Sequence, residues 1–182
     1  MRKLVEATLV SLDGVVDSPE EWALPFWGEE NKSHAHAQLA DVDAFLLGRV
    51  TYEKFVAAWS PVDGDPYLDT INRLPKFVAS ASLQDTTWNS TLITGDVAAE
   101  ITRLKDQPGK TIMKYGTGQL DRTLIQHGLI DEFHLSIFPL TVGNGLRLFE
   151  GIDTAGMGLK LTGTTTFSNG IVQLTYIPQY GR

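Results

Sequence analysis

The chain has 182 residues, of which 42% are hydrophobic and 20% are charged, and this composition fits one globular domain better than two small ones. The formal net charge of -7 argues against broad binding to nucleic acid or to an anionic membrane surface, because both depend on an excess of Lys and Arg. The absence of cysteine excludes a disulfide framework, a thiolate metal site and a cysteine nucleophile.

The amino-terminal stretch MRKLVEATLV lacks the long apolar run and the small-residue cleavage site of a secretory signal. No run approaches the roughly 18 apolar residues that a membrane-spanning helix needs. We therefore expect a cytoplasmic protein.

Apolar runs and helical periodicity alternate through the first two thirds of the chain. In chain order, this pattern predicts strands at 3–10, 44–48, 76–80, 91–95 and 111–115, and helices at 31–41, 51–59, 65–74, 96–106 and 119–129. Asp96 stands where an N-cap is expected, and Gly128 stands where the last helix should stop. The alternation implies a mainly parallel sheet with helices on both faces.

The last third of the chain follows a different pattern. Three strands are predicted at 132–140, 159–167 and 171–177, with no helix between them, and Ser168-Asn169-Gly170 is a turn signal typical of a hairpin. The Gly-, Pro- and Asp-rich stretch 60–66 is interpreted as a surface loop. The prediction is a single three-layer α/β domain over 1–182, whose mixed central sheet ends in an antiparallel hairpin.

Several common nucleotide, hydrolase and metal motifs fail on their spacing. Gly109-Lys110-Thr111 precedes a strand and lacks the earlier glycine of a phosphate-binding P-loop, and no G-x-S-x-G elbow is present. His34 and His36 are two positions apart, which directs them to different sides of a helix. We therefore expect no metal site.

The stretch FLLGRVTYEKF (45–55) carries the strongest local signal. A buried strand ends at Gly48 and a helix begins near Thr51, so free backbone N–H groups and the positive end of the helix dipole could attract phosphate there. Arg49 adds a fork of donors beside the same spot. The plainer alternative is that Thr51 only caps the helix and Arg49 pairs with a nearby acid.

The stretch YGTGQL (115–120) repeats this strand-to-helix geometry. Gly116 and Gly118 lack Cβ atoms, so a pyrophosphate could approach the backbone closely, although the same residues would also make an ordinary tight turn. A third corner, FVASASL, brings Ser80 and Ser82 to the same end of the sheet, where parallel sheets bind ligands. Three such corners together favour a dinucleotide that carries an extra phosphate.

The first strand ends in SLDGVV (11–16), at the same end of the predicted sheet. Asp13-Gly14 is either a turn or a site where Asp13 orients a substrate or shuttles a proton. The following stretch 17–30 contains Trp22, Phe26 and Trp27 and several acids. It is either a surface loop with aromatic anchors or a lid over a planar ligand.

These stretches occur together in an order that resembles a known family. VSLDGVV, LLGRVTYE, VAS and YGTGQL, followed by LIQHGLIDEFHLSIFPLTVGNGLRLF, resemble the dihydrofolate reductase-like family that includes the carboxyl-terminal reductase domain of bifunctional riboflavin-biosynthesis enzymes. The resemblance covers nearly the whole chain, to about residue 177.

The resemblance implies a dihydrofolate reductase-like fold, NADPH as hydride donor and commonly a homodimer. Gly48, Arg49 and Thr51 would hold cofactor phosphates, and Ser80 and Ser82 would lie near the adenosine 2′-phosphate. The pyrophosphate would lie against five consecutive residues, Gly116, Thr117, Gly118, Gln119 and Leu120. Asp13 and Gly14 would border the nicotinamide and the substrate, and Trp22, Phe26 and Trp27 would cover the substrate.

Two departures from the family concern the substrate. The riboflavin-pathway reductases read Glu-Gly-Gly where this chain reads Tyr115-Gly116-Thr117, so Tyr115 replaces an acid in the substrate pocket. Dihydrofolate reductases carry an acid in the helix after the lid, where Asn31 fills the closest register. The corresponding step is often a cis peptide in the family, whereas a cis bond before a residue other than proline costs about 2.5–4 kcal/mol, so the sequence leaves cis and trans open for Gly116-Thr117.

Three hypotheses for function follow. The first is an NADPH-dependent reductase that transfers hydride to a planar heterocycle or a related small molecule, similar to 5-amino-6-(5-phosphoribosylamino)uracil reductase. Asp13, Glu30 or a water between them would supply the proton. The second is a catalytically weak or inactive NADP-binding module or sensor on the same scaffold. The third is a structural dimer that uses EFHLSIFPL as its contact strand.

Overall fold

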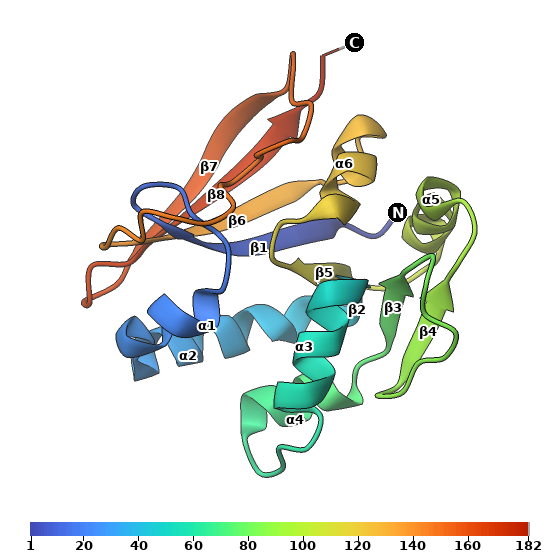
Figure 1. Ribbon diagram of the computed structural model, residues 1–182, viewed down its shortest axis with the longest axis horizontal. Helices are drawn as coiled ribbons and strands as arrows, with labels where there is room; N and C mark the ends of the chain where they lie inside the picture. The colour runs from blue at the N-terminus through green and yellow to red at the C-terminus, as the bar shows by residue number, and fades with distance from the viewer. Residues whose placement is uncertain (182) are drawn as a thin grey trace.

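A mixed sheet of eight strands forms the centre of the protein, which a computed structural model describes over residues 1–181 (Figure 1). The strands are β1 Leu4–Ser11, β2 Val42–Gly48, β3 Lys76–Ala79, β4 Ser90–Ile93, β5 Thr111–Tyr115, β6 Glu132–Phe138, β7 Gly158–Thr166 and β8 Val172–Gln179. Their order across the sheet is β4-β3-β2-β5-β1-β6-β8-β7. The first six strands in sequence pair in parallel, whereas β8 pairs antiparallel with both β6 and β7.

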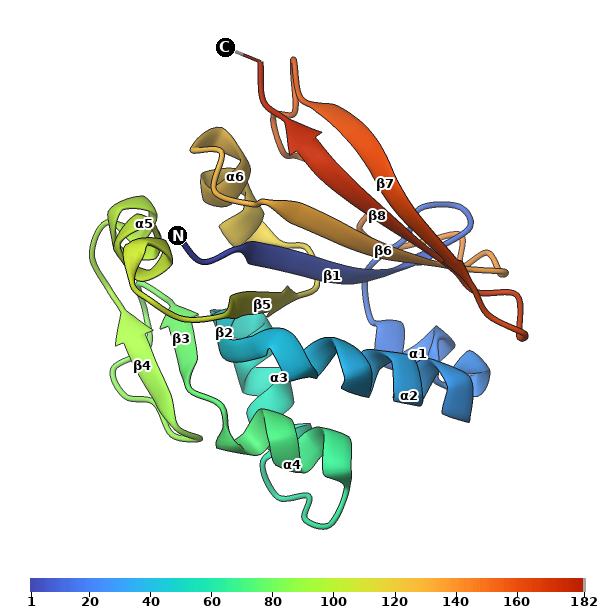
Figure 2. The ribbon, with the colours of Figure 1, turned by 180° about the vertical axis from the view of Figure 1, so that it is seen from behind.

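The helices form two layers, one on each face of the sheet. They are α1 Pro19–Trp22, α2 Glu29–Gln38, α3 Arg49–Trp59, α4 Pro66–Arg73, α5 Val97–Asp106 and α6 Gln119–Gln126, with short 3-10 turns η1 Leu24–Phe26 and η2 Leu39–Asp41. Helices α5 and α6 cover one face, while α2, α3 and α4 lie on the other (Figures 1 and 2). The predicted three-layer α/β fold with a carboxyl-terminal antiparallel hairpin is confirmed.

The two cores follow from the alternation of side chains along the strands. On β1, Leu4 and Val10 face the α5 and α6 layer, whereas Val5 faces the α3 and α4 layer, as the two-residue period of a strand requires. On α5, Ile101 and Leu104 are buried against the first face. The parallel strands are therefore covered on both sides and read as nearly continuous apolar runs.

The predicted helix boundaries hold where a capping residue marks them. Asp96 accepts a hydrogen bond from the Ala99 amide at 3.1 Å and caps α5. Helix α6 ends in a Schellman motif, in which Gly128 has a φ of 61°. The Gly128 N–H donates to the carbonyl oxygen of Ile125, and the Leu129 N–H donates to that of Leu124.

Two sequence-based expectations were wrong in this region of the fold. Helix α3 begins at Arg49, with Gly48 at the N-cap position, so Thr51 is the third residue of the helix and does not cap it. Strand β6 lies between β1 and β8 in the interior of the sheet. It therefore cannot be the contact strand of a dimer, as the third hypothesis required.

Candidate functional site

The parallel strands bring the predicted phosphate corners to one end of the sheet. Strands β2 and β5 are neighbours, so the corner after Gly48 and the corner after Tyr115 lie side by side. A Cβ atom placed on Gly48 would lie 3.8 Å from the Cβ of Leu120. The amino-terminal ends of α3 and α6 therefore converge on a single region, here called the carboxyl end of the sheet.

At the first corner, Arg49 already has an intramolecular partner. Its guanidinium pairs with Glu53, one turn later in α3, at 3.2 Å, and both side chains are about half exposed. An exposed pair of this kind is worth little to stability, so it does not prevent Arg49 from binding an anion. Thr51 is partly buried on the same first turn.

The second corner has a more defined geometry. Gly116 has a φ of 74°, which favours glycine, and no peptide bond within residues 1–181 is cis. Gly118 is the N-cap of α6, and its N–H donates to the buried carboxylate of Asp121 at 2.5 Å. We call the segment Gly116–Leu120 the cradle. The Gly116-Thr117 peptide, which the sequence left open, is trans.

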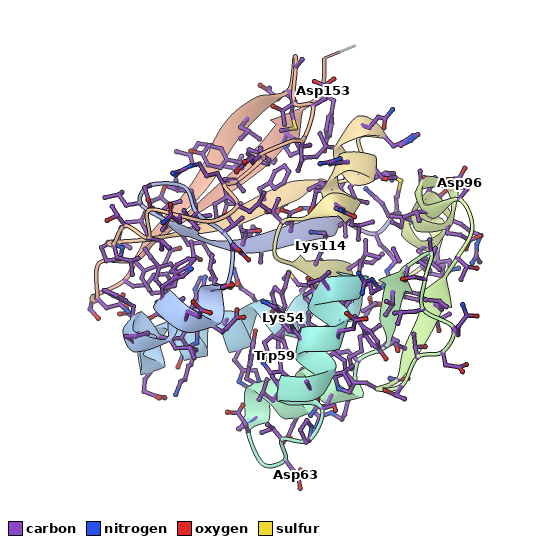
Figure 3. The ribbon with its side chains drawn as sticks, in the orientation of Figure 1. Lys54, Trp59, Asp63, Asp96, Lys114 and Asp153 are labelled. Atoms are coloured by element: carbon purple, nitrogen blue, oxygen red, sulfur yellow. The ribbon has the colours of Figure 1, made fainter. Side chains whose placement is uncertain are left out.

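A buried polar cluster that the sequence interpretation missed lies directly under the cradle. Lys114 contacts the two carboxylate oxygens of Asp121 at 2.8 and 2.9 Å and Glu6 at 3.4 Å, and it also donates to the carbonyl oxygen of Gly116. The Thr117 hydroxyl donates to Glu6 at 2.9 Å. Figure 3 places Lys114 near the centre of the molecule, at β5. We call Glu6, Lys114 and Asp121 the buried triad.

The third corner is adjacent to the first, because β3 pairs with β2. The Ser80 hydroxyl oxygen accepts hydrogen bonds from the backbone N–H groups of Ser82 and Leu83 at 3.2 and 3.1 Å. Ser80 thus shapes the turn after β3, while Ser82 is exposed to solvent. Both serines lie at the end of the sheet where they were predicted.

Asp13 holds two loops together at the carboxyl end of β1. Its carboxylate accepts hydrogen bonds from the Ser11 hydroxyl at 2.6 Å and from the backbone N–H groups of Val142 and Gly143 at 3.1 and 2.8 Å. These donors lower the pKa of Asp13 to about 2, with the Ser11 bond as the largest cause. Gly14 follows with a φ of 88°, and its carbonyl oxygen accepts from Leu148 at 2.9 Å.

Glu30 connects α2 to the turn of the last hairpin through hydrogen bonds. It accepts hydrogen bonds from the hydroxyl and the backbone N–H of Ser168 at 2.6 and 2.9 Å, and these bonds lower its pKa. Asn31 beside it is buried, and its side-chain oxygen accepts from the amide of Asn169 at 2.6 Å. Both predicted proton donors are therefore ionised at neutral pH and engaged in loop contacts.

The predicted aromatic lid packs on a single buried ring. Trp22, Phe26 and Trp27 surround Phe138, with ring centroids at 5.4, 6.3 and 6.3 Å, and Phe138 is fully buried at the end of β6. Segment 17–30, which includes α1 and η1, is thus anchored to the sheet by its aromatic residues. We call Trp22, Phe26, Trp27 and Phe138 the aromatic cluster.

Tyr115 lies in a different group of aromatic side chains, on the α3 and α4 face. Its hydroxyl bonds that of Tyr67 at 2.9 Å, and its ring lies 5.2 Å from Phe45 and 6.2 Å from both Phe55 and Trp59. Burial raises the pKa of Tyr115 well above its ordinary value. The group that replaces the family acid is therefore a neutral phenol.

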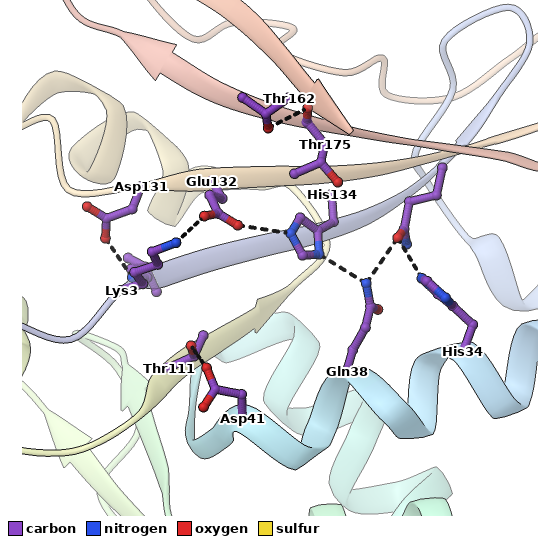
Figure 4. A network of polar contacts seen from close by, with 12 residues as sticks. Lys3, His34, Gln38, Asp41, Thr111, Asp131, Glu132, His134, Thr162 and Thr175 are labelled. Carbon is purple, nitrogen blue, oxygen red and sulfur yellow. Dashed lines mark hydrogen bonds and ion pairs between the residues drawn. The ribbon is translucent and has the colours of Figure 1, made fainter. Parts of the chain in front are cut away.

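Helix α2 is attached to the sheet by a polar network, which the sequence interpretation also missed (Figure 4). The Gln38 amide contacts His134 at 3.2 Å and Gln173 at 3.0 Å, and His34 contacts Gln173 at 2.8 Å. Burial lowers the pKa of His134, so its ring is neutral at pH 7. These contacts fix the position of the helix that carries Glu30.

A comparison of the sequence with known families identifies its lineage. The model of the RibD C-terminal domain matches residues 2–173. The chain belongs to the RibD C-terminal domain family. The chain is also 34% identical over 180 residues to the uncharacterized protein YwjB of Bacillus subtilis, covering 97% of this chain and 98% of YwjB.

Solved structures with the same fold include reductases. A candidate riboflavin biosynthesis protein from Shewanella sp. PV-4 superposes with a TM-score of 0.78 at 20% identity, covering 97% of this chain and 99% of that one. Dihydrofolate reductase from Enterococcus faecalis, solved with NADP(H), superposes with a TM-score of 0.63 at 15% identity, covering 97% and 96%. The fold of this chain is thus dihydrofolate reductase-like.

No helix within residues 1–181 is both long enough and apolar enough to cross a membrane.

Proposed function

We propose that the protein is an NADPH-dependent reductase that transfers hydride to a planar heterocycle or a related small molecule. The observation that carries this proposal is the convergence of the α3 and α6 amino termini beside Gly48 and the cradle. Free N–H groups at two adjacent helix ends favour a ligand with more than one phosphate. Ser80 and Ser82 at the neighbouring corner are positioned for the additional 2′-phosphate of NADPH.

In this proposal the protein supplies position, and the cofactor supplies the hydride. Gly48, Arg49 and Thr51 hold one phosphate group, and the cradle holds the pyrophosphate. Asp13 and Gly14 border the nicotinamide, while the aromatic cluster and Tyr115 bound the substrate. The neutral phenol of Tyr115 favours an uncharged hydride acceptor over a protonated heterocycle, because a buried cation would lack a counter-charge there.

The proposal is tested by titration with NADPH and NADH, monitored by fluorescence or calorimetry. We expect saturable binding at submillimolar concentration, tighter for NADPH than for NADH. Arg49→Ala should weaken NADPH binding about tenfold or more, since a hydrogen bond to a charged group is worth about 1.5–3 kcal/mol. Arg103→Ala is the matched control, because Arg103 forms a similar exposed pair with Glu100 on α5. Lack of saturable binding to either nucleotide would exclude this function.

A second candidate is an NADP-binding module or sensor without significant turnover. It is favoured by the contacts of Asp13 and Glu30, which leave both carboxylates ionised and occupied by loop donors. Binding of NADPH without its oxidation across a panel of pterins, pyrimidines and carbonyl compounds would support this candidate over the reductase.

We also propose that the protein acts in the cytoplasm and forms a homodimer. Strand β7 lies at the end of the sheet, and Leu161 on it and Ile177 on β8 are 50% and 41% exposed. An edge strand with exposed apolar side chains is a common site of association. Light scattering after size-exclusion chromatography tests this proposal, and Leu161→Glu should shift the protein to the monomer.

A further inference from the structure

The buried triad is an unusual set of charges for the interior of a small protein. Glu6 and Asp121 are fully buried and Lys114 is 3% exposed, and charges in such a place are tolerated only when they are paired and hydrogen-bonded. The three residues come from β1, β5 and α6. The preceding positions on the same face of the two strands, Leu4 on β1 and Ile112 on β5, belong to the apolar core.

Each member of the triad makes one side-chain hydrogen bond to the cradle. Lys114 donates to the Gly116 carbonyl, Glu6 accepts from the Thr117 hydroxyl at 2.9 Å, and Asp121 accepts from the Gly118 N–H at 2.5 Å. The Thr8 hydroxyl completes the set, at 3.3 Å from Glu6 and 3.2 Å from the Thr117 hydroxyl. The inner side of the cradle is therefore attached to the triad at three consecutive residues.

The bond from Lys114 to Gly116 determines the direction of the next N–H group. In a trans peptide, the C=O and the following N–H point in opposite directions. The Gly116 carbonyl points inward to Lys114, so the Thr117 N–H points outward, away from the triad. That N–H has no hydrogen-bond partner within residues 1–181, and it lies next to the first amide groups of α6.

We propose that Lys114, held in place by Asp121 and Glu6, is a positioning residue that turns the Thr117 N–H toward a bound pyrophosphate. The inference rests on the proposed function in naming NADPH as the ligand that carries this group. Lys114 itself does not reach the ligand; it acts through the Gly116-Thr117 peptide.

Glu6 adds a dependence on pH that a purely structural cluster would not produce in ligand binding. The ionisable groups that face it are Lys114 from β5 and Asp121 from α6, with the Tyr180 phenol nearby. Burial and the adjacent Asp121 charge raise the pKa of Glu6 well above its ordinary value. With Glu6 protonated, Lys114 and Asp121 balance each other. Loss of that proton leaves an uncompensated negative charge under the cradle, which weakens binding of an anion.

The first test is NADPH affinity in the variant Lys114→Met. We expect the dissociation constant to rise tenfold or more. Lys76→Met is the matched control: Lys76 is also fully buried and donates to three backbone carbonyls, but it lies at the amino end of β3, away from the cradle. Equal NADPH affinity in Lys114→Met and the wild type, both folded by circular dichroism, would overturn the proposal.

The second test compares the wild type with Glu6→Gln, which mimics the protonated acid. NADPH affinity of the wild type should fall as the pH is raised above neutrality and Glu6 loses its proton, in a range where the cofactor phosphates no longer titrate. Glu6→Gln should remain nearly constant over this range. The same decline in both proteins would refute the role of the triad, and this comparison also decides the matter if Lys114→Met fails to fold.

A third readout separates this inference from the identity of the cofactor. The amide resonance of Thr117 in 15N-labelled wild-type protein should shift on addition of inorganic pyrophosphate, and this shift should be smaller in Lys114→Met than in Lys76→Met. If the wild type binds pyrophosphate through Thr117 but does not bind NADPH, the proposed function is wrong and the positioning role stands. If the Thr117 resonance is unaffected by pyrophosphate while NADPH binds elsewhere, the positioning role is wrong.

Discussion

Replacement of Phe138 by Leu tests whether the aromatic cluster anchors segment 17–30. The substitution retains most of the buried apolar area but removes ring contacts with Trp22, Phe26 and Trp27. At about 0.5–1.5 kcal/mol for each aromatic pair, the free energy of unfolding should fall by about 2–4 kcal/mol. For a chain of this size, the thermal midpoint should fall by roughly 5–15 °C.

Phe133→Leu provides the control, because Phe133 is equally buried on the same strand but faces the opposite core. The Phe133 ring makes one ring contact, with Phe149 at 5.6 Å. The decrease in the free energy of unfolding in Phe133→Leu should therefore be smaller than in Phe138→Leu by about 1–3 kcal/mol. Limited digestion with chymotrypsin, which cuts after aromatic residues, should cleave segment 17–30 in Phe138→Leu only. Similar cleavage of this segment in both variants, or in neither, would refute the anchoring role.

Three further substitutions test contacts at the same end of the sheet. Asp13→Asn should reduce the pH dependence of the free energy of unfolding on the acid side, because the pKa of Asp13 in the folded protein, about 2, lies below its ordinary 3.8. The stability that Asp13 contributes is present above pH 4 and is lost as the pH falls toward 2, which thermal melts between pH 2 and 6 will show. Gly145→Ala should lower the free energy of unfolding by about 1–3 kcal/mol, since the new Cβ would lie 2.8 Å from Val15 at a φ of 127°. In the control Gly156→Ala the new Cβ meets no neighbour, so urea denaturation should show a smaller loss of stability. Tyr115→Phe removes the bond to Tyr67, should cost about 1 kcal/mol, and should leave NADPH affinity unchanged in a binding titration.

The sequence was sufficient to predict the elements and the end of the sheet at which the site residues gather. Each corner could be located because it follows an apolar run and precedes a segment with the periodicity of a helix. The corners could be placed together because the carboxyl ends of parallel strands lie at the same end of a sheet. The start of α3 was misplaced, since Gly48 occupies the N-cap position where a Ser, Thr or Asp signal was sought. Glycine at that position carries no side chain that marks the boundary.

The buried triad could not be recognised without knowing which strands are neighbours. Glu6 and Lys114 are 108 positions apart, and they meet because β1 pairs with β5 in a register that places them opposite each other. The sequence nevertheless carried a signal for this ion pair. Glu6 is the single charged residue in the apolar stretch LVEATLV, and Lys114, of opposite sign, is the single charged residue in TIMKY. The network under α2 was missed for a related reason: stretch 31–38 has no apolar stripe, and its partners on β6 and β8 are distant in sequence.

The protonation states at the carboxyl end of the sheet bear on how a reduction would be completed. A proton donor works best when its pKa lies near the working pH, but hydrogen bonds lower the pKa of both Asp13 and Glu30. Glu6 has a raised pKa, yet it is enclosed beneath the cradle by Lys114 and Asp121. No acid among these three combines a suitable pKa with access to a substrate. If the protein is a reductase, we therefore expect water to supply the proton, an arrangement that suits hydride acceptors that are electrophilic without prior protonation.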